Sequence, residues 1–494
     1  MLIRNRSFVS TLMILSLLFS QQVLACTGII VGKAASATGS YMIARNEDFP
    51  ENNWAKHMVV RVAAEHEEGD LWQFGSGLSV AKPSKTLQYT AMPDWDANTL
   101  GSGAGPFEEV GINSLNVAVT ATYSAEANEK SQKADPFVKP GIDESVIPTL
   151  LLSQATSARH AVELLGGYVE SIGAAEANGL AISDQKEAWL MEIGSGHHWI
   201  AVKVPDNQYV VQANALRIYD IDITNKKRVL HSKGLLEHVK KHQLLGEVNS
   251  KRFDFARAFG VLNDDYNTDR IWLAQHLLSP SIYQEIRQER YPLFMKPDKK
   301  LTVLDIANML RADYTGTPLE GKAERVIGID RNVESHIIEM RPGMPPELAG
   351  VIWQSIGNVS DSIFIPLYGS ITDTPRAYRL GTNEFDSVSA YWRFRSVGAL
   401  LNSSDGQYRE ALHELRDQAE QRLVASLPYV DNAIKKMLAK DREMALWYIN
   451  MHSNGFALQA LERVSEIRSK LMTDITKSTE KEYDPEEWKK ISEL

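Results

Sequence analysis

The sequence has a single cysteine in 494 residues, and this scarcity excludes an internal disulfide. Stability must come from a packed core, for which a hydrophobic content of 44% is sufficient. Basic residues are not in excess either: the formal net charge is -10, which argues against a nucleic-acid-binding surface. After residue 25 no stretch approaches the roughly 20 apolar residues of a membrane span, so we expect no stable membrane insertion.

Familiar cofactor and metal motifs are also missing. The glycine-rich stretch at 101–105 has no following helix or lysine of the phosphate-loop kind. His197-His198 and Glu334-Ser335-His336 lack the helical histidine pair that zinc peptidases use. The sequence therefore predicts no cofactor and no metal site. No internal repeat and no linker rich in Gly, Ser or Pro divides the chain.

The lone cysteine, Cys26, follows a stretch with the composition of a signal peptide. Two arginines near the start, an apolar segment at 8–19 and the small residues Val23 and Ala25 form the pattern of a signal peptidase site. We therefore predict a signal peptide over 1–25, cleavage before the cysteine, and a secreted or periplasmic protein.

Cleavage there would make Cys26 the first residue of the mature chain. Its α-amine, with a pKa of about 8, could then accept the proton of its own thiol, with a pKa of about 8.5, as in N-terminal-nucleophile hydrolases. Two alternatives stay open. Val23–Cys26 also resembles a lipobox, in which the cysteine would be lipidated, and the thiol could simply be buried and inert. The apolar, β-branched run Thr27–Val31 favours a buried strand over the polar tether of a lipoprotein.

Apolar patterning predicts an α+β fold with a catalytic domain over 26–405. Strands are expected at 26–33, 40–46, 58–63, 114–122, 179–183, 188–193, 199–204, 209–213, 335–340 and 350–353. Helices are expected at 147–172, 255–262, 271–278 and 303–314. From 406 the sequence is polar and amphipathic, which predicts a helical C-terminal extension over 406–494 packed on the main domain.

Polar residues at the ends of predicted strands could assist a cysteine nucleophile. A hairpin from Cys26 would return Arg45 and Asp48 beside it, where the guanidinium could lower the thiol pKa and the carboxylate could hold the α-amine. The alternative is a solvated turn with an Arg–Asp ion pair. Asn113 and Asn214 could donate to an oxyanion, although asparagines in loops are commonly turn residues.

The opening run Cys26–Lys33, followed by Ala44-Arg45-Asn46-Glu47-Asp48, resembles the start of the cysteine dipeptidase A family of N-terminal-nucleophile hydrolases. Further similar blocks follow in the family's order: Glu109–Asn113, Glu187–Glu192, Val204–Asp206, Ala213-Asn214 and Ser389–Arg395. The resemblance implies a four-layer αββα sandwich and hydrolysis of dipeptides without a metal or another cofactor.

The wider clan includes bile-salt hydrolases and penicillin V acylases, whose catalytic set is Cys, Arg, Asp, Asn and a second Arg. Four members of this set have matching residues here: Cys26, Arg45, Asp48 and Asn214. Arg252 resembles the second arginine. A further oxyanion Asn of the acylases aligns near Thr122, and this departure favours the dipeptidase branch.

Three functions are therefore expected, in descending order. The first is a secreted cysteine dipeptidase whose partners are small peptide substrates. The second is an N-acyl amide hydrolase of the penicillin V acylase or bile-salt hydrolase kind, and the third is a non-catalytic, lipid-anchored binding protein. No nucleic-acid partner is expected, and a homo-oligomer stays open.

Overall fold

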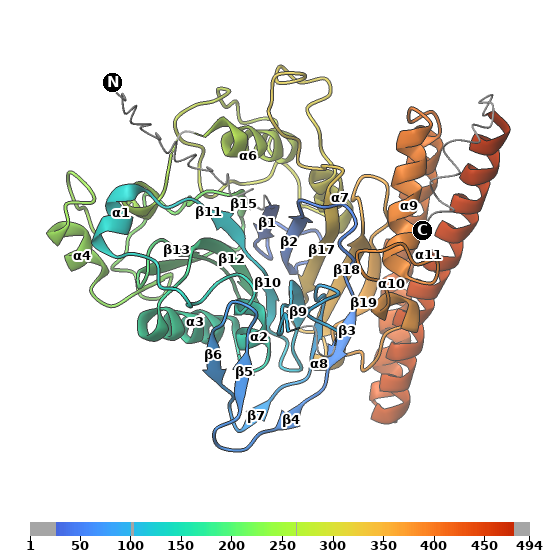
Figure 1. The fold of residues 1–494 in the computed structure, drawn as a ribbon, viewed down its shortest axis with the longest axis horizontal. Coiled ribbons are helices and arrows are strands. Elements are labelled where there is room, and N and C mark those ends of the chain that lie inside the picture. The colour runs from blue at the N-terminus through green and yellow to red at the C-terminus, as the bar shows by residue number, and fades with distance from the viewer. Residues whose placement is uncertain (1–25, 100–102, 263, 479–494) are drawn as a thin grey trace, which may run out of the picture.

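Two antiparallel β-sheets form the centre of the molecule in the computed structural model, which describes residues 26–99, 103–262 and 264–478 (Figure 1). The predicted signal peptide over 1–25 lies outside the described residues. The first sheet has the order β15 (Tyr209–Gln212), β1 (Thr27–Val31), β2 (Tyr41–Asp48), β17 (Asn332–Met340), β18 (Gly350–Ile356), β19 (Ile365–Tyr368). β1, which follows the cysteine directly, is thus flanked on both sides.

The second sheet has the order β16 (Val229–His231), β14 (Trp199–Lys203), β13 (Ala188–Ile193), β12 (Ala177–Ser183), β10 (Ala118–Thr120), β9 (Val110–Ile112), with β11 (Tyr123–Ala125) also pairing with β12. Three small ribbons lie beside the sheets: β3 (Val59–Arg61) with β8 (Tyr89–Ala91), β4 (Ala64–Glu65) with β7 (Lys85–Thr86), and β5 (Leu71–Gln73) with β6 (Ser79–Ala81).

Side chains alternate between the two faces of each strand, and this alternation builds separate cores. Ile30 and Ile43 of the first sheet share one core with Leu190 of the second, so this core lies between the sheets. Their neighbours Ile29 and Ala44 belong to a core on the outer face of the first sheet. Both faces of these strands are buried, so β1 and the first half of β2 are apolar, whereas the second half of β2 buries the polar residues Arg45–Asp48.

Helices cover both outer faces. The first sheet packs against α6 (Asp265–Leu278), α7 (Val303–Leu310) and α10 (Arg409–Leu438). The second sheet packs against α2 (Ile147–Leu152) and α3 (Ala158–Ile172). The observed order of layers is therefore helix, sheet, sheet, helix. The remaining helices are α1 (Glu129–Ala134), α4 (Leu235–Lys241), α5 (Phe255–Phe259), α8 (Pro346–Ala349), a 3-10 turn (Arg376–Arg379), α9 (Ala390–Ser403) and α11 (Arg442–Ser478).

Three predicted elements differ in extent from the structure: one is divided and two are shorter. The helix predicted over 147–172 is interrupted between α2 and α3, because the Ser157 side chain accepts a hydrogen bond from the His160 amide and starts a new helix. The strand predicted over 114–122 is only β10, because a turn precedes it in which Asn116 has a φ of 60°. The helix predicted over 303–314 ends earlier, at Leu310.

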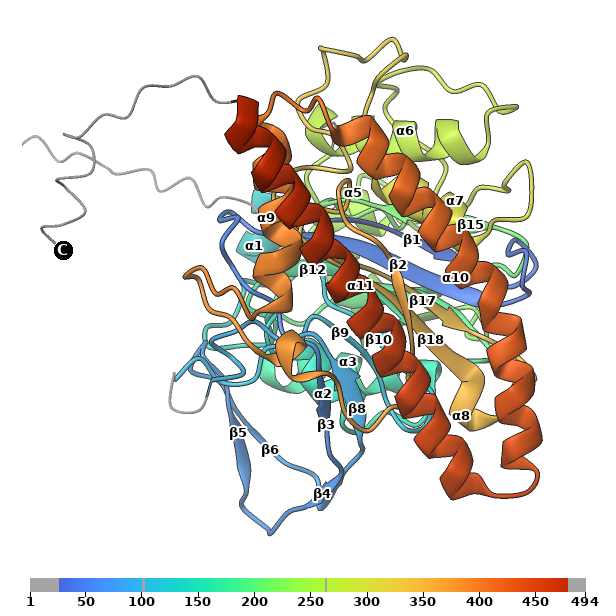
Figure 2. The same ribbon diagram turned by 90° about the vertical axis from the view of Figure 1, so that its right-hand side faces the viewer.

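The C-terminal part is a pair of long helices, α10 and α11, of which α11 lies beside α9 (Figure 2). α11 packs against α9 and β19, and its Leu461 and Val464 belong to the same core as Phe394 of α9. None of the helices in the described ranges combines the length and the apolar character that crossing a membrane requires.

Candidate active site

Cys26 lies immediately before β1 and is almost completely buried, with 1% of its surface exposed. β1 pairs antiparallel with β2, and Gly28 stands opposite Arg45. A Cβ at Gly28 would lie 2.3 Å from the Tyr123 hydroxyl oxygen, so only glycine lets this tyrosine from the second sheet approach. The hairpin therefore holds the thiol between the two sheets.

The hairpin brings Arg45 directly to the thiol, as the sequence led us to expect. Its Nη2 donates to Cys26 Sγ at 3.0 Å and to Glu144 Oε1 at 3.2 Å. Its Nη1 donates to Glu109 Oε2 at 3.1 Å. The guanidinium is fully buried, so these contacts are what compensates its charge.

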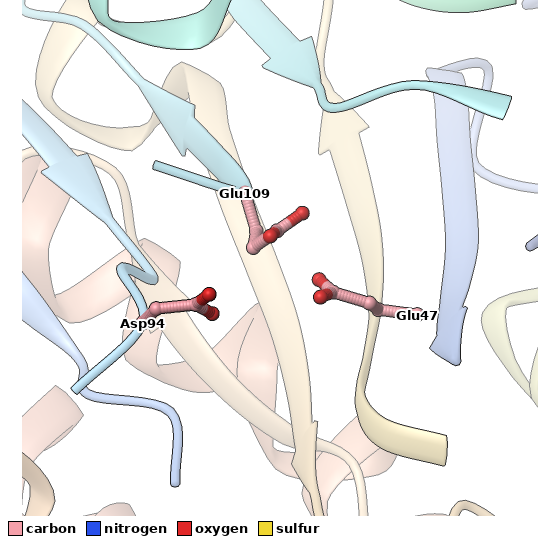
Figure 3. Close-up of side chains that lie close together, drawn as sticks. All are labelled: Glu47, Asp94 and Glu109. Atoms are coloured by element: carbon pink, nitrogen blue, oxygen red, sulfur yellow. The ribbon is translucent and has the colours of Figure 1, made fainter. Parts of the chain in front are cut away.

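Beyond Arg45 lies a second buried cation, Lys56, inside a ring of carboxylates. Figure 3 shows Glu47, Asp94 and Glu109 pointing toward one another, an arrangement that could hold a metal ion. However, Lys56 Nζ lies 2.5 Å from Glu47 Oε1 and 3.1 Å from Glu109 Oε1, and also contacts Asp94. The ammonium group thus already occupies the place that a metal ion would need.

Four carboxylates surround only two cations, so the carboxylates do not ionise equally. Burial, followed by repulsion from Glu109, raises the pKa of Glu47 well above its usual range and that of Glu144 to about 8. Burial alone would raise the pKa of Glu109 too, but Lys56 and Arg45 lower it to about 2. Near neutral pH the cluster therefore retains protons on some of its carboxyl groups.

The same surroundings keep the thiol protonated. Burial raises the pKa of Cys26 to about 12; Arg45 opposes this shift, whereas the charge of Glu144 adds to it. A reaction at Sγ therefore needs a base that removes the proton as the bond forms.

Asp48 ends β2 and is buried. The register places Thr27 opposite Asn46, so its continuation puts Asp48 near the amino end of Cys26. The carboxylate accepts a hydrogen bond from Asn332 Nδ2 and forms an ion pair with Arg325. This fixed anion is suitable for holding a positively charged amine.

Arg270, on α6, links Cys26 to Asn214. Its Nη1 donates to the Cys26 carbonyl oxygen at 2.9 Å and to Thr27 Oγ1 at 2.7 Å. Its Nη2 donates to Asn214 Oδ1 at 3.0 Å and to Asn267 Oδ1 at 2.6 Å. Asn214 follows β15, the neighbour of β1, and the contact with the arginine fixes the orientation of its amide.

The prediction for Arg252 is wrong on geometric grounds. Its side chain is 73% exposed and forms an ion pair with Asp220 at 2.5 Å. Arg270 is instead the buried arginine that contacts Cys26. The sequence does contain a signal for Arg270. It directly precedes the apolar run Ile271–Leu273, which is expected to be buried, and an arginine that is buried with such a run is rarely without a partner.

Asn113 is a structural residue and does not belong to the site. Its Nδ2 donates to the carbonyl oxygens of Leu152 and Ala155, and its Oδ1 accepts from the amides of Leu115 and Val117. These contacts hold the turn between β9 and β10 against α2.

Sequence reasoning also missed other charged residues of the site. Glu144 lies in the loop before α2 and Arg325 in the loop before β17, far along the chain from the cysteine. No local pattern marks either residue. Glu109 was part of a similar block, but its role as a partner of Arg45 depends on the contact between the two sheets.

Comparison with known proteins finds similarity over most of the chain. The family model described as peptidase family C69 matches residues 25–421. A probable dipeptidase of Latilactobacillus sakei is 33% identical over 443 residues, covering 86% of this chain and 92% of that protein. A probable dipeptidase of Salmonella dublin is 36% identical over 365 residues (72% and 83%), and a dipeptidase of Bifidobacterium longum is 32% identical over 426 residues (78% of each).

Proposed function

The chain belongs to peptidase family C69 and is a peptidase, and we propose that it hydrolyses dipeptides with Cys26 as its N-terminal nucleophile. The relatives named as dipeptidases support the substrate class. The observation that carries the mechanism is the buried Cys26 Sγ, 3.0 Å from the Arg45 guanidinium and at the start of a central strand.

In the proposed reaction, Cys26 Sγ attacks the scissile carbonyl carbon while the α-amine, freed by removal of residues 1–25, takes the thiol proton. The protonated amine returns this proton to the leaving amine, and water hydrolyses the acyl-enzyme. The raised pKa of the thiol supports this scheme, because little thiolate exists before the amine acts.

The neighbouring residues have separate proposed roles. Asp48, held by Arg325 and Asn332, orients the α-amine and stabilises its protonated form. Asn214, oriented by Arg270, donates to the oxyanion of the tetrahedral intermediate.

The carboxylate cluster supports a preference for substrates with a free amino group. Glu144 lies 3.2 Å from the arginine Nη2 that contacts the nucleophile, and its side chain is 10% exposed. A dipeptide carries its ammonium group on the carbon next to the scissile carbonyl. Once this charge is buried beside Glu144, it lowers the raised pKa of that carboxyl group and so obtains the anion that its burial requires. An N-acylated substrate has no such charge, so the cluster favours a dipeptidase over an acylase.

The fold and the location are part of the proposal. The order helix, sheet, sheet, helix supports an N-terminal-nucleophile hydrolase sandwich, with the cysteine at the start of a central strand. The signal-peptide pattern of residues 1–25 supports secretion or periplasmic location.

Single-turnover hydrolysis of dipeptides and their N-acetylated analogues tests this function. Wild type should hydrolyse the free dipeptides at least ~10²-fold better, and Cys26→Ser should lose most activity because its hydroxyl is a weaker nucleophile. Mass spectrometry should find the mature chain starting at Cys26. A matched control is Arg252→Lys, a surface variant that should act like wild type.

Each other outcome identifies an alternative. Preference for the N-acetylated compounds would support the acylase, and a diacylated cysteine without hydrolysis would support the lipid-anchored binding protein. Activity that survives both the serine substitution and alkylation of the thiol would disprove the nucleophile.

A further inference from the structure

Three arginines gather on the side of Cys26 that faces α6. Arg270 of α6 donates to the Cys26 carbonyl oxygen at 2.9 Å, and its guanidinium carbon lies 4.9 Å from the centre of the Tyr266 ring. Arg325 Nη1 and Arg331 Nη2, from the loop before β17, donate to the hydroxyl oxygen of the same tyrosine at 3.2 and 3.3 Å. The reaction described above uses neither Tyr266 nor Arg331.

We propose that Tyr266, Arg325 and Arg331 form a binding site for the C-terminal carboxylate of a dipeptide, an assignment that rests on the proposed function. A guanidinium group presents two parallel N–H donors that match the two oxygens of a carboxylate, so arginine is well suited to recognise this group. The site would hold the residue that leaves as the amine when the peptide bond is broken.

Positive charges outnumber negative ones in this part of the molecule. Arg325 forms an ion pair with Asp48, whereas Arg270 and Arg331 form none with any residue in the described ranges. The hydrogen bonds of Arg270 go to carbonyl, hydroxyl and amide oxygens, all of them neutral. A buried cation without an anion is costly, so an anionic ligand bound here would remove a cost that the protein alone carries.

The two arginines that contact the tyrosine also have unused donors. Arg325 is buried, with 5% of its surface exposed, and its Nε makes no hydrogen bond with any residue that the structure describes. The same holds for the buried Nε of Arg331. Buried N–H groups in folded proteins almost always have an acceptor. A carboxylate, which only accepts hydrogen bonds and has about four lone-pair positions, would supply one to each arginine.

Tyr266 adds a neutral donor to the site. Its oxygen accepts hydrogen bonds from the two arginines, so its own proton can be donated to a third group. Burial raises the pKa of Tyr266, and the charges of Arg270, Arg331 and Cys26 also act on it. The hydroxyl group is therefore protonated near neutral pH and lies within electrostatic reach of the cysteine.

The surroundings of Cys26 thus carry opposite charges on two sides. The carboxylates around Glu144 lie beyond Arg45, which contacts the Cys26 sulfur, whereas the carboxylate-binding site lies beyond Arg270, which contacts the Cys26 carbonyl oxygen. A dipeptide has an ammonium group on one side of its scissile bond and a carboxylate on the other. The two sides therefore match its two ends, and a longer peptide could not place its terminal carboxylate at the same position.

Titration calorimetry of the mature Cys26→Ala protein with alanyl-alanine and alanyl-alaninamide tests the site without turnover. The dipeptide should bind at least ~10-fold more tightly than its amide, because only the dipeptide has the carboxylate. Adding Arg331→Gln should weaken binding of the dipeptide and remove most of this preference, whereas Arg331→Lys should retain part of it, since lysine keeps the charge but not the paired donors. The matched control is Arg252→Gln, at an exposed arginine, which should keep the full preference.

In the active enzyme, Arg331→Gln should raise KM for the dipeptide and change hydrolysis of the amide by less than ~2-fold, a difference that a merely structural defect would not produce. If Arg331→Gln fails to fold, Tyr266→Phe decides the question, because it removes only the hydroxyl group and should weaken dipeptide binding at least ~5-fold. Equal binding of the dipeptide and the amide, or an equal effect of the substitution on both, would overturn the carboxylate site. Binding with the expected preference but no hydrolysis by wild type would support the site and overturn the proposed function.

Discussion

Arg270 and Arg252 differ in burial, and this difference separates a residue of the site from a surface residue. Arg270 is fully buried and donates to the Cys26 carbonyl and to Asn214, whereas Arg252 is mostly exposed beside Asp220. A lysine cannot reproduce the two-sided contacts of a guanidinium. The two arginines therefore provide a matched test.

We expect Arg270→Lys to lower kcat by ~10- to 100-fold, because Cys26 and Asn214 lose their common support. Arg252→Lys should stay close to wild type, since an exposed ion pair contributes little. Steady-state kinetics of correctly processed protein measures both. Equal kcat values for the two variants would remove Arg270 from the site.

The positions nearest the cysteine in sequence were the most predictable ones. Arg45 is one short hairpin away, and alternation along β2 places its side chain on the face of Gly28. Glu144 and Arg270 could not be predicted in the same way, because they reach the site from a loop and from a helix of other layers. Arg252 was chosen because the residues next to it resemble the family pattern, and these residues do not indicate whether its side chain is buried.

At the scale of elements, the helices after residue 405 form part of the core. Arg341, which follows β17, forms a buried ion pair with Asp431 of α10 at 2.6 Å, and the Tyr368 hydroxyl of β19 donates to the same carboxylate at 2.8 Å. The sequence predicted these helices but gave no contact that fixes them. The structure shows such a contact, between Asp431 of α10 and Arg341, which directly follows β17.

We expect Asp431→Asn to reduce the free energy of unfolding by about 3–5 kcal/mol, because Arg341 would remain buried without its anion. The control is Glu466→Gln on α11, where the pair with Arg463 is exposed and should contribute less than about 0.5 kcal/mol. Denaturant titration compares the two variants. A small effect of Asp431→Asn would mean that the helices dock mainly through apolar contacts.

The apolar periodicity of a sequence does not reveal where a helix is interrupted. The apolar spacing over 147–172 continues through the residues between α2 and α3, so it predicts one helix. The cap at Ser157 is visible in the sequence, but serine also occurs inside helices. Only the packing of α2 against β9 and β10 requires the change of direction.

At the scale of the whole molecule, the buried carboxylates should make stability depend on pH. Burial raises the pKa of Glu144 from its usual 4.5 to about 8, so the folded chain binds this proton more tightly than the unfolded chain. The resulting stabilisation is complete below about pH 4.5 and is lost as the pH rises through about 8.

Glu144→Gln removes this titration, so its free energy of unfolding should exceed that of wild type at about pH 8.5 by about 1–3 kcal/mol and differ less at about pH 5. Urea titrations at the two pH values measure the difference. Glu129→Gln, at an exposed carboxylate, should follow wild type at both. Parallel pH profiles of Glu144→Gln and wild type would contradict the raised pKa.

The layered α+β arrangement was accessible from strand and helix patterning, whereas the strand order was not. Patterning predicted strands at 26–33, 40–46 and 335–340, where β1, β2 and β17 lie, but it does not show that β17 pairs with β2 across almost 300 residues. Pairings over such distances depend on the closure of the entire core.

The position of β1 also determines when the surroundings of Cys26 can form during synthesis. Its two neighbours are β2, which follows at once, and β15, which leaves the ribosome only after about 180 further residues. Arg270 comes later still, and the core shared with α9 is completed by Leu461 and Val464 near the end of the described chain. Because distant pairings form late, Cys26 is among the last residues to reach its final surroundings, and a partly synthesised chain lacks the contacts with β15 and Arg270 that hold it.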